Sequence, residues 1–238
     1  MDTDLTEIAD GIYRISTFRD PPGLVFNQFL VVAEQPLVFH AGHRSLFPGV
    51  TEAVRYVIDP TTLRWVSFGH LEADECGAMN EWLGVAPHAQ VVHGRIGVGV
   101  SLEDMADRRP IALADGETLD LGGKRVRWVD TPQLPHGWEA GLLFEETTAT
   151  LFAGDLFTAL GPGPAIGATD PVGPALAAED TSHPTALTAR TSVQIEALAG
   201  LAPTTIAPMH APAFTGDGVG ALRDLAGGYE ERFRATLT

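Results

Sequence analysis

Apolar residues alternate along the chain between short runs typical of buried strands and longer stretches with helical spacing. Residues 25–33 (VFNQFLVVA) are rich in β-branched and aromatic residues, which predicts a strand. Residues 49–58 carry Val50, Val54 and Val57 at helical spacing, which predicts a helix. The same reasoning predicts strands at 11–16, 36–41, 63–68, 90–92, 118–121, 126–129, 141–145, 150–153 and 204–207, and helices at 74–83, 99–105, 183–198 and 222–233.

The stretch 161–174 (GPGPAIGATDPVGP) interrupts this alternation. Its high content of glycine and proline predicts neither helix nor strand there. Strands and helices alternate again after it, so we interpret the stretch as a surface loop and not as a linker. We therefore expect a single domain of the α/β class over residues 1–238, with two small domains as the alternative.

The charge balance excludes some classes of partner. Apolar residues make up 45% of the chain, which is a normal share for a globular protein. Asp and Glu number 31 against 15 Lys and Arg, so the net charge is −16. Nucleic acids and anionic membrane surfaces bind basic patches, so we expect neither as a partner. The lone cysteine, Cys76, excludes a disulfide framework and a four-cysteine metal site.

The N-terminal residues do not have the pattern of a signal peptide. The sequence MDTDLTE carries acidic residues where a signal peptide has a basic region followed by an apolar one. Nor does any apolar run approach the roughly 18 residues that cross a membrane. We therefore expect a cytoplasmic protein.

Residues able to bind a metal follow several of the expected strands. Strand ends that lead into loops are where α/β folds place their functional sites. Glu72 and Asp74 follow His70 at alternate positions, so in an extended segment the three side chains leave on the same side. The histidines and the aspartate that come just after strands are His70, His136, Asp155 and His210.

These motifs together resemble the metallo-β-lactamase superfamily. The resemblance rests on four elements: the HxExD segment at 70–74, the later His136, the AGD element at Asp155 and the APMH element at His210. Within the superfamily they resemble the diiron domain of flavodiiron proteins and the related oxygen-binding diiron proteins. The resemblance spans nearly the whole chain, and it implies a four-layer αβ/βα sandwich with the site at its edge.

The resemblance also implies a set of six metal ligands around two metals. One metal would have His70, Glu72 and His136. The other would have Asp74 and His210, with Asp155 bridging the two. Zinc hydrolases of the superfamily read HxHxDH, with a histidine where this chain has Glu72. Oxygen ligands favour iron or manganese, so we expect two iron ions, with manganese or zinc as alternatives.

The expected function is that of a non-haem diiron protein that binds O2 or NO. It would act as a sensor with a signalling partner or as an oxidoreductase with a separate electron donor. Flavodiiron proteins continue into a flavodoxin-like domain that holds FMN, and we expect no bound FMN in this chain. The alternative is a binuclear zinc hydrolase acting on an ester, thioester or lactam. The oligomeric state stays open, with a homodimer as one option.

Two positions depart from the patterns of the superfamily. Glu75 stands where the hydrolases have a metal-binding histidine, and the diiron relatives have a non-ligand there. It therefore fits the diiron pattern, although its side chain could still reach a metal. His40 stands where many relatives have an aspartate, and we expect a structural, hydrogen-bonding histidine.

Overall fold

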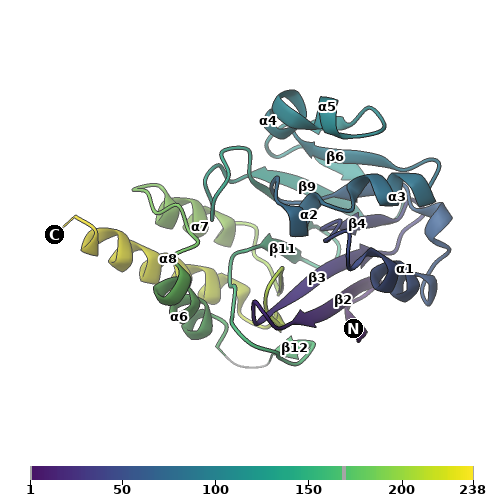
Figure 1. The fold of residues 1–238 in the computed structure, drawn as a ribbon. Helices are drawn as coiled ribbons and strands as arrows, with labels where there is room; N and C mark the ends of the chain where they lie inside the picture. The colour runs from purple at the N-terminus through teal and green to yellow at the C-terminus, as the bar shows by residue number, and fades with distance from the viewer. Residues whose placement is uncertain (1, 168–169, 238) are drawn as a thin grey trace.

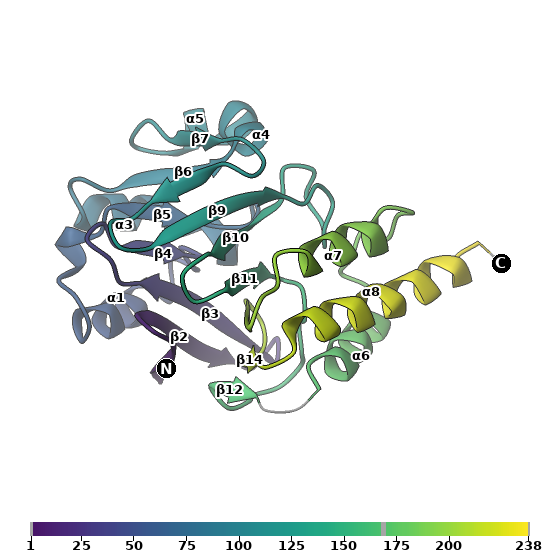
Figure 2. The ribbon, with the colours of Figure 1, turned by 180° about the vertical axis from the view of Figure 1, so that it is seen from behind.

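Two mixed β-sheets pack face to face at the centre of the molecule, and helices cover the outer face of each sheet (Figure 1). The computed structural model describes residues 2–167 and 170–237. Helices α1 and α3 lie on one side of the sheets and α6, α7 and α8 on the other, as the view from behind also shows (Figure 2). This arrangement is the four-layer αβ/βα sandwich that the sequence predicts.

The first sheet comes from the N-terminal half of the chain. Its first four strands are antiparallel neighbours, and the rest add in parallel. The order across the sheet is β1 (Thr3–Ala9), β2 (Ile12–Arg19), β3 (Leu24–Val31), β4 (Leu37–Phe39), β5 (Trp65–Ser67), β6 (Gln90–Gly94) and β7 (Ile111–Leu113).

The second sheet comes from the C-terminal half. Strands β11 and β13 are parallel neighbours at its centre, which requires a long crossover between them. The order across the sheet is β12 (Ile166–Gly167), β14 (Ala213–Thr215), β13 (Thr205–Pro208), β11 (Thr150–Gly154), β10 (Gly141–Glu145), β9 (Arg125–Asp130) and β8 (Thr118–Asp120).

The helices fall into the two outer layers and the loops that connect the strands. In the N-terminal half they are α1 (Phe47–Arg55), η1 (Pro60–Thr62), α2 (Ala73–Cys76), α3 (Met79–Val85), α4 (Arg95–Gly97), η2 (Val98–Leu102) and α5 (Glu103–Met105). In the C-terminal half they are α6 (Val172–Ser182), α7 (Thr191–Ala199) and α8 (Gly218–Ala235). In the described residues, no helix is both long and apolar enough to span a membrane.

Three apolar clusters hold the layers together. Phe29, Trp128 and Phe152 are fully buried between the two sheets. A second cluster joins the first sheet to α1 and α3 and includes Trp82. A third joins the second sheet to α6, α7 and α8 and includes Leu222. Each sheet is therefore buried on both faces, which explains the near-continuous apolar runs of its central strands.

Two expectations about the C-terminal half are wrong. The stretch 161–174 contains strand β12 and the start of α6. Pro174 lies in the first turn of α6, where a helix tolerates proline. Residues 168–169 of the stretch lie outside the described residues.

The helix expected at 183–198 is wrong in its first part. His183 has a left-handed backbone (φ 48°, ψ 50°) and ends α6, and the next helix begins only at Thr191. Pro184 therefore follows a helix end, where proline is common because it cannot continue the helix.

Candidate metal centre

All six residues expected at the metal site lie together at one edge of the sandwich. His70 follows β5, and Asp155 directly follows β11. His210 follows β13, and His136 lies in the loop between β9 and β10. Glu72 and Asp74 stand at the start of α2. The ends of strands from both sheets thus bring residues from four separate segments to one place.

A close approach of two backbone segments positions His70. The Gly141 N–H donates to the Gly69 carbonyl at 2.9 Å. A Cβ atom on Gly69 would lie 3.0 Å from the carbonyl oxygen of Gly141, tighter than almost all real contacts. Glycine at position 69 therefore lets the first sheet meet the second directly before His70.

The first group of the site is formed by His70, Glu72, His136 and Asp155. The Nε2 atoms of His70 and His136 lie 3.0 Å apart, and Glu72 Oε2 lies 3.1 Å from each of them. Asp155 Oδ2 lies 3.6 Å from His70 Nε2 and 3.5 Å from His136 Nε2. One atom from each of the four residues lies within 4.8 Å of all the others.

The second group shares Asp155 with the first. His210 Nε2 lies 3.2 Å from Asp74 Oδ2 and 3.4 Å from Asp155 Oδ1. The two carboxylate oxygens of Asp155 therefore face different groups. A carboxylate placed in this way can join two cations.

The backbone holds two of the three histidine rings in place. His136 Nδ1–H donates to the Pro184 carbonyl at 3.1 Å, and His210 Nδ1–H donates to the Val25 carbonyl at 2.8 Å. A ring that donates from Nδ1 presents the lone pair of Nε2 when it is neutral. Both rings therefore direct a free donor atom towards the carboxylates.

Glu75 lies behind His70 and points away from the other ligand candidates. Its side chain is fully buried, and Oε2 accepts the Gly69 N–H at 2.7 Å. Oε1 lies 3.7 Å from His70 Nδ1 and 3.3 Å from His40 Nε2. His40 Nδ1–H donates to the Asn27 carbonyl at 2.9 Å. Glu75 and His40 thus form a buried pair that supports the His70 ring from behind.

Burial dominates the protonation of this pair. It lowers the pKa of His40 to about 4 and raises the pKa of Glu75 above its ordinary value. The two atoms that face each other, His40 Nε2 and Glu75 Oε1, form no hydrogen bond in the part of the chain that the structure describes. A structural role for His40 therefore stays a prediction.

The acidic and imidazole groups of the site shift one another's pKa values. Burial lowers the pKa of His70, but the surrounding carboxylates, Glu72 foremost, outweigh burial and raise it to about 10. Burial likewise opposes protonation of His210, and its hydrogen bonds to carboxylates raise its pKa well above the ordinary value. Burial raises the pKa of Asp155, but the neighbouring imidazoles, His210 first, lower it to about 2. The lowered pKa values of Glu72 and Asp155 keep both carboxylates ionised, so this part of the site favours a positive charge.

The donor atoms fit two divalent cations. Two imidazole nitrogens 3.0 Å apart, with carboxylate oxygens around them, form a convergent set in which protons take the place of a cation. Three imidazoles and three carboxylates suit iron, manganese or zinc by ligand type. The residues present therefore fit the pair of metals that the resemblance implies.

Sequence reasoning missed the residues that support this site from outside it. Glu139 Oε1 accepts the backbone N–H of Leu71 at 3.1 Å and so fixes the loop between His70 and Glu72. Asn27 Nδ2 donates to the carbonyls of Pro208 and Ala211 at 2.8 Å, on either side of His210. Backbone carbonyls carry no signal in a sequence, so these contacts could not be read from it.

The family model described as "ODP family beta lactamase" matches residues 24–210. The chain belongs to this family. The matched region begins with β3 and ends at His210, so it contains all six residues of the candidate centre. Membership in the ODP family confirms the resemblance to the metallo-β-lactamase superfamily.

Relatives of this ODP family chain are flavodiiron proteins. The flavo-diiron protein FprA2 of Clostridium acetobutylicum is 26% identical over 116 residues, which cover 47% of this chain and 29% of that protein. The diflavin flavoprotein A 1 of Synechocystis sp. is 26% identical over 139 residues, which cover 57% of this chain and 24% of that protein. The matches thus span less than a third of either relative.

The fold is similar to that of a solved flavodiiron structure. Rubredoxin oxygen:oxidoreductase from Desulfovibrio gigas superposes with a TM-score of 0.81 at 20% sequence identity. The superposition covers 97% of this chain and 62% of the D. gigas protein. The ODP family chain therefore has the metallo-β-lactamase-like fold of the flavodiiron core.

Proposed function

We propose that this chain is a non-haem diiron protein that binds O2 or NO and reduces it with electrons from a separate donor. The observation that carries the proposal is the position of Asp155, whose two oxygens face His136 and His210 on opposite sides. The names of the relatives support the choice of iron and of oxygen chemistry.

The six candidate residues would form two sets of metal ligands that share one carboxylate. His70, Glu72 and His136 would hold one, Asp74 and His210 the other, and Asp155 would bridge them. Two bound ferrous ions would supply two electrons and open coordination positions for a diatomic ligand. The carbonyls behind His136 and His210 would keep both rings fixed while a ligand enters.

The exposure of the side chains gives the direction of entry. Glu72 is 54% exposed and His136 is 30% exposed, whereas His70 and His210 are 5% and 7% exposed. A small ligand would therefore reach the centre past Glu72 and His136. The buried histidines would form the closed wall of the site.

Glu72 and Glu75 argue against a zinc hydrolase. Glu72 supplies an oxygen where the hydrolases have an imidazole, which moves the preference towards harder metals. Glu75, at the other hydrolase ligand position, accepts a backbone N–H and faces His40 instead of the centre. An additional imidazole at each position, typical of a binuclear zinc site in this superfamily, is therefore missing from this centre.

The experiment that tests the proposal compares the iron-loaded and the zinc-loaded protein. The reduced iron form should change its absorption spectrum on one pulse of O2 or NO and should consume the gas steadily once a rubredoxin-type donor is added. The zinc form should not cleave esters, thioesters or lactams. Hydrolysis by the zinc form, with no response of the iron form to either gas, would reverse the assignment.

A further inference from the structure

Arg14 is a buried arginine that the metal centre does not use. It follows Ile12 by two residues on β2, so it lies on the strand face that is turned towards the second sheet. The residue is only 3% exposed, and its Nε and Nη2 atoms have no hydrogen-bond partner among residues 2–167 and 170–237. Burial lowers the pKa of Arg14 to about 10, so the side chain stays charged at neutral pH.

The unpaired charge is unusual. A buried ion without a partner costs several kcal/mol, and buried charges are therefore normally paired. Asp4 is the acidic group that raises the pKa of Arg14 by its charge, yet Asp4 is exposed and forms no ion pair with it in the described part of the chain. The fold thus keeps a cation in the interior that has an acidic neighbour but no ion-pair partner among the described residues.

Arg14 lines a hollow of about 360 Å³ between the edge of the first sheet and the segment 162–165. The segment is tied down at both ends, because the Gly161 N–H donates to the Gly23 carbonyl at 2.8 Å and the Ala213 N–H donates to the Ala165 carbonyl at 3.1 Å. The walls include Thr6, Ser16, Val25, Pro164 and the exposed Asp4. Hydroxyl groups and apolar side chains therefore surround the guanidinium, and one carboxylate, that of Asp4, lines the same hollow.

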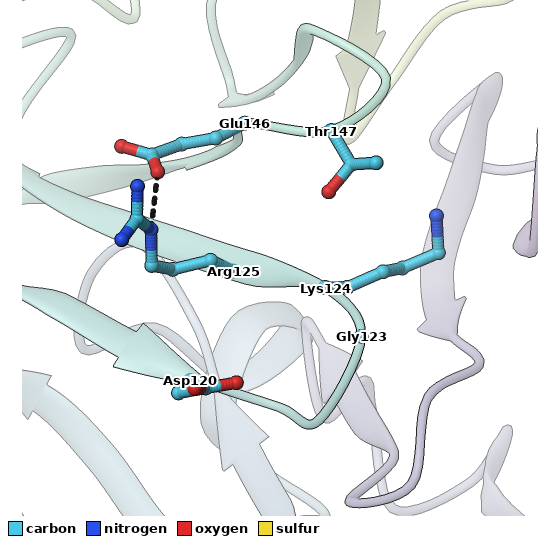
Figure 3. A pocket seen from close by; sticks show the side chains of 6 residues that line it. All are labelled: Asp120, Gly123, Lys124, Arg125, Glu146 and Thr147. Carbon is cyan, nitrogen blue, oxygen red and sulfur yellow. Dashed lines mark hydrogen bonds and ion pairs between the residues drawn. The ribbon is translucent and has the colours of Figure 1, made fainter.

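The larger hollow shown in Figure 3 is different. It is about 430 Å³ in volume and contains Lys124 and Arg125, but Arg125 pairs with Glu146 across it. Glu146 also pairs with Arg127. Lys124 lies 3.8 Å from a carboxylate oxygen of Asp10, so each of these cations has an ion-pair partner, unlike Arg14.

We propose that the hollow at Arg14 binds a small molecule through a carboxylate or phosphate group. The Nε and Nη2 atoms lie along one edge of the guanidinium plane, and two donors on one edge match two oxygens of one such group. The Ser16 hydroxyl, on the same strand face as Arg14, would be a third donor. This inference does not depend on the metals.

The site adjoins the metal centre through one residue. Val25 lines the hollow, and its carbonyl accepts the Nδ1–H of His210. The segment 162–165 continues from the loop after Asp155, and the Ala159 N–H donates to the His210 carbonyl at 3.0 Å. A ligand at Arg14 would therefore rest against backbone that supports His210 and follows Asp155.

The first test uses nuclear magnetic resonance on the whole wild-type chain. Inorganic phosphate and acetate are titrated separately against the Nε–H signal of Arg14, with chloride at the same ionic strength as the control. A saturable shift with phosphate alone, with acetate alone or with both supports the proposal and identifies the anionic group. No shift with either anion beyond the chloride control overturns it.

The second test compares thermal unfolding of matched variants. A bound anion at 100 times its Kd should raise the Tm of the wild type by about 5–10 °C. Arg14→Met should lose this response, and Arg14→Lys should bind about tenfold or more weakly because it lacks the fork of donors. Arg125→Met, in the hollow of Figure 3, should respond like the wild type. An equal response in Arg14→Met would contradict the proposal.

Arg14→Met also separates a binding role from a structural one. Without anion, removal of an unpaired buried charge should leave the Tm unchanged or raise it. A folded Arg14→Met protein with a lowered Tm in anion-free buffer would mean that the protein itself satisfies the charge, and it would contradict the proposal. If this variant does not fold, the titration of the wild-type protein alone decides.

Discussion

The ring nitrogens Nε2 of His70 and His136 lie 3.0 Å apart, although 66 positions separate the two residues in the chain. Two protonated imidazoles would repel each other at this distance, whereas two neutral ones would share one cation between their lone pairs. The carboxylates around them add negative charge. This relationship fits the shared cation of the proposed diiron centre.

Removing one of these rings should lower the metal content. In His136→Ala the first group loses an imidazole, so the iron content should fall from about two per chain to about one or less, because each lost ligand weakens the binding of that metal. Iron and protein are quantified on samples reconstituted without oxygen.

His88→Ala is the matched control, because His88 is exposed and is not among the candidate ligands. It should keep the wild-type iron content. Equal iron in the wild type, His136→Ala and His88→Ala would show that His136 is not a ligand.

Substitutions at two adjacent carboxylates should have opposite results. Asp74→Asn removes a charged ligand from the second group and should reduce the iron content to about one per chain. Glu75→Gln should retain both metals, because an amide can still accept the Gly69 N–H and donate to His40 Nε2. Loss of a metal in a folded Glu75→Gln protein would move the site towards the hydrolase arrangement.

The metal-free protein should have a characteristic pH dependence of stability. The pKa of His70 is raised from 6.5 to about 10. Its contribution to the free energy of unfolding is therefore fully present below pH 6.5 and is lost as the pH rises through about 10. The pKa of Asp155 is lowered from 3.8 to about 2. Its contribution to the free energy of unfolding is therefore present above pH 3.8 and is lost as the pH falls through about 2.

The Tm of the chelated protein should therefore be highest between about pH 4 and 6.5 and should decline towards pH 10. Calorimetric scans over this range provide the measurement. In His70→Gln the alkaline decline should be smaller, and an unchanged decline would assign it to other groups.

Much of the fold and of the candidate centre could be predicted from the sequence, because apolar runs indicate the central strands and a short motif indicates the ligand candidates. The central strands are continuous apolar runs, and the HxExD segment places three ligand candidates within five residues. Strand β1 was missed because it is a half-exposed edge strand with little apolar alternation. The break between α6 and α7 differs from the prediction because Pro184 is compatible both with a first helical turn and with a helix end, and here it follows His183, whose left-handed backbone ends α6.

Other features of the site could not be predicted. The direction in which Glu75 points follows from its contacts with the nearby Gly69 N–H and with His40, which is remote in the sequence. The rings of His136 and His210 are held by hydrogen bonds to backbone carbonyls, which every residue has and which a sequence therefore does not single out. The buried Arg14 lies in a strand whose sequence, IYRISTFR, gives no sign that its third residue faces the interior between two sheets.

The reductions of NO and of O2 differ in the number of electrons that they need from the two ferrous ions. Reduction of two NO to N2O consumes two electrons, which two ferrous ions can supply, whereas reduction of O2 to water consumes four. Without a donor, the reduced protein should convert about two NO per chain. It should react with O2 once and then stop until a flavin- or rubredoxin-type donor is added. Gas consumption and absorption spectra are recorded together.

Reversible binding of O2 without consumption, even with a donor present, would favour the sensor over the reductase. The acidic chain, with a net charge of −16, should also accept electrons from an acidic donor faster as salt screens the repulsion.

The central claim is that Asp155 joins two metals in one centre. Its most direct test is Mössbauer and electron paramagnetic resonance spectroscopy of the iron-loaded, oxidised protein, with iron quantified on the same sample. The account predicts about two iron ions per chain in a magnetically coupled pair, and uncoupled iron in Asp155→Asn. Isolated high-spin iron in the wild type, at about one ion per chain or less, would contradict the account.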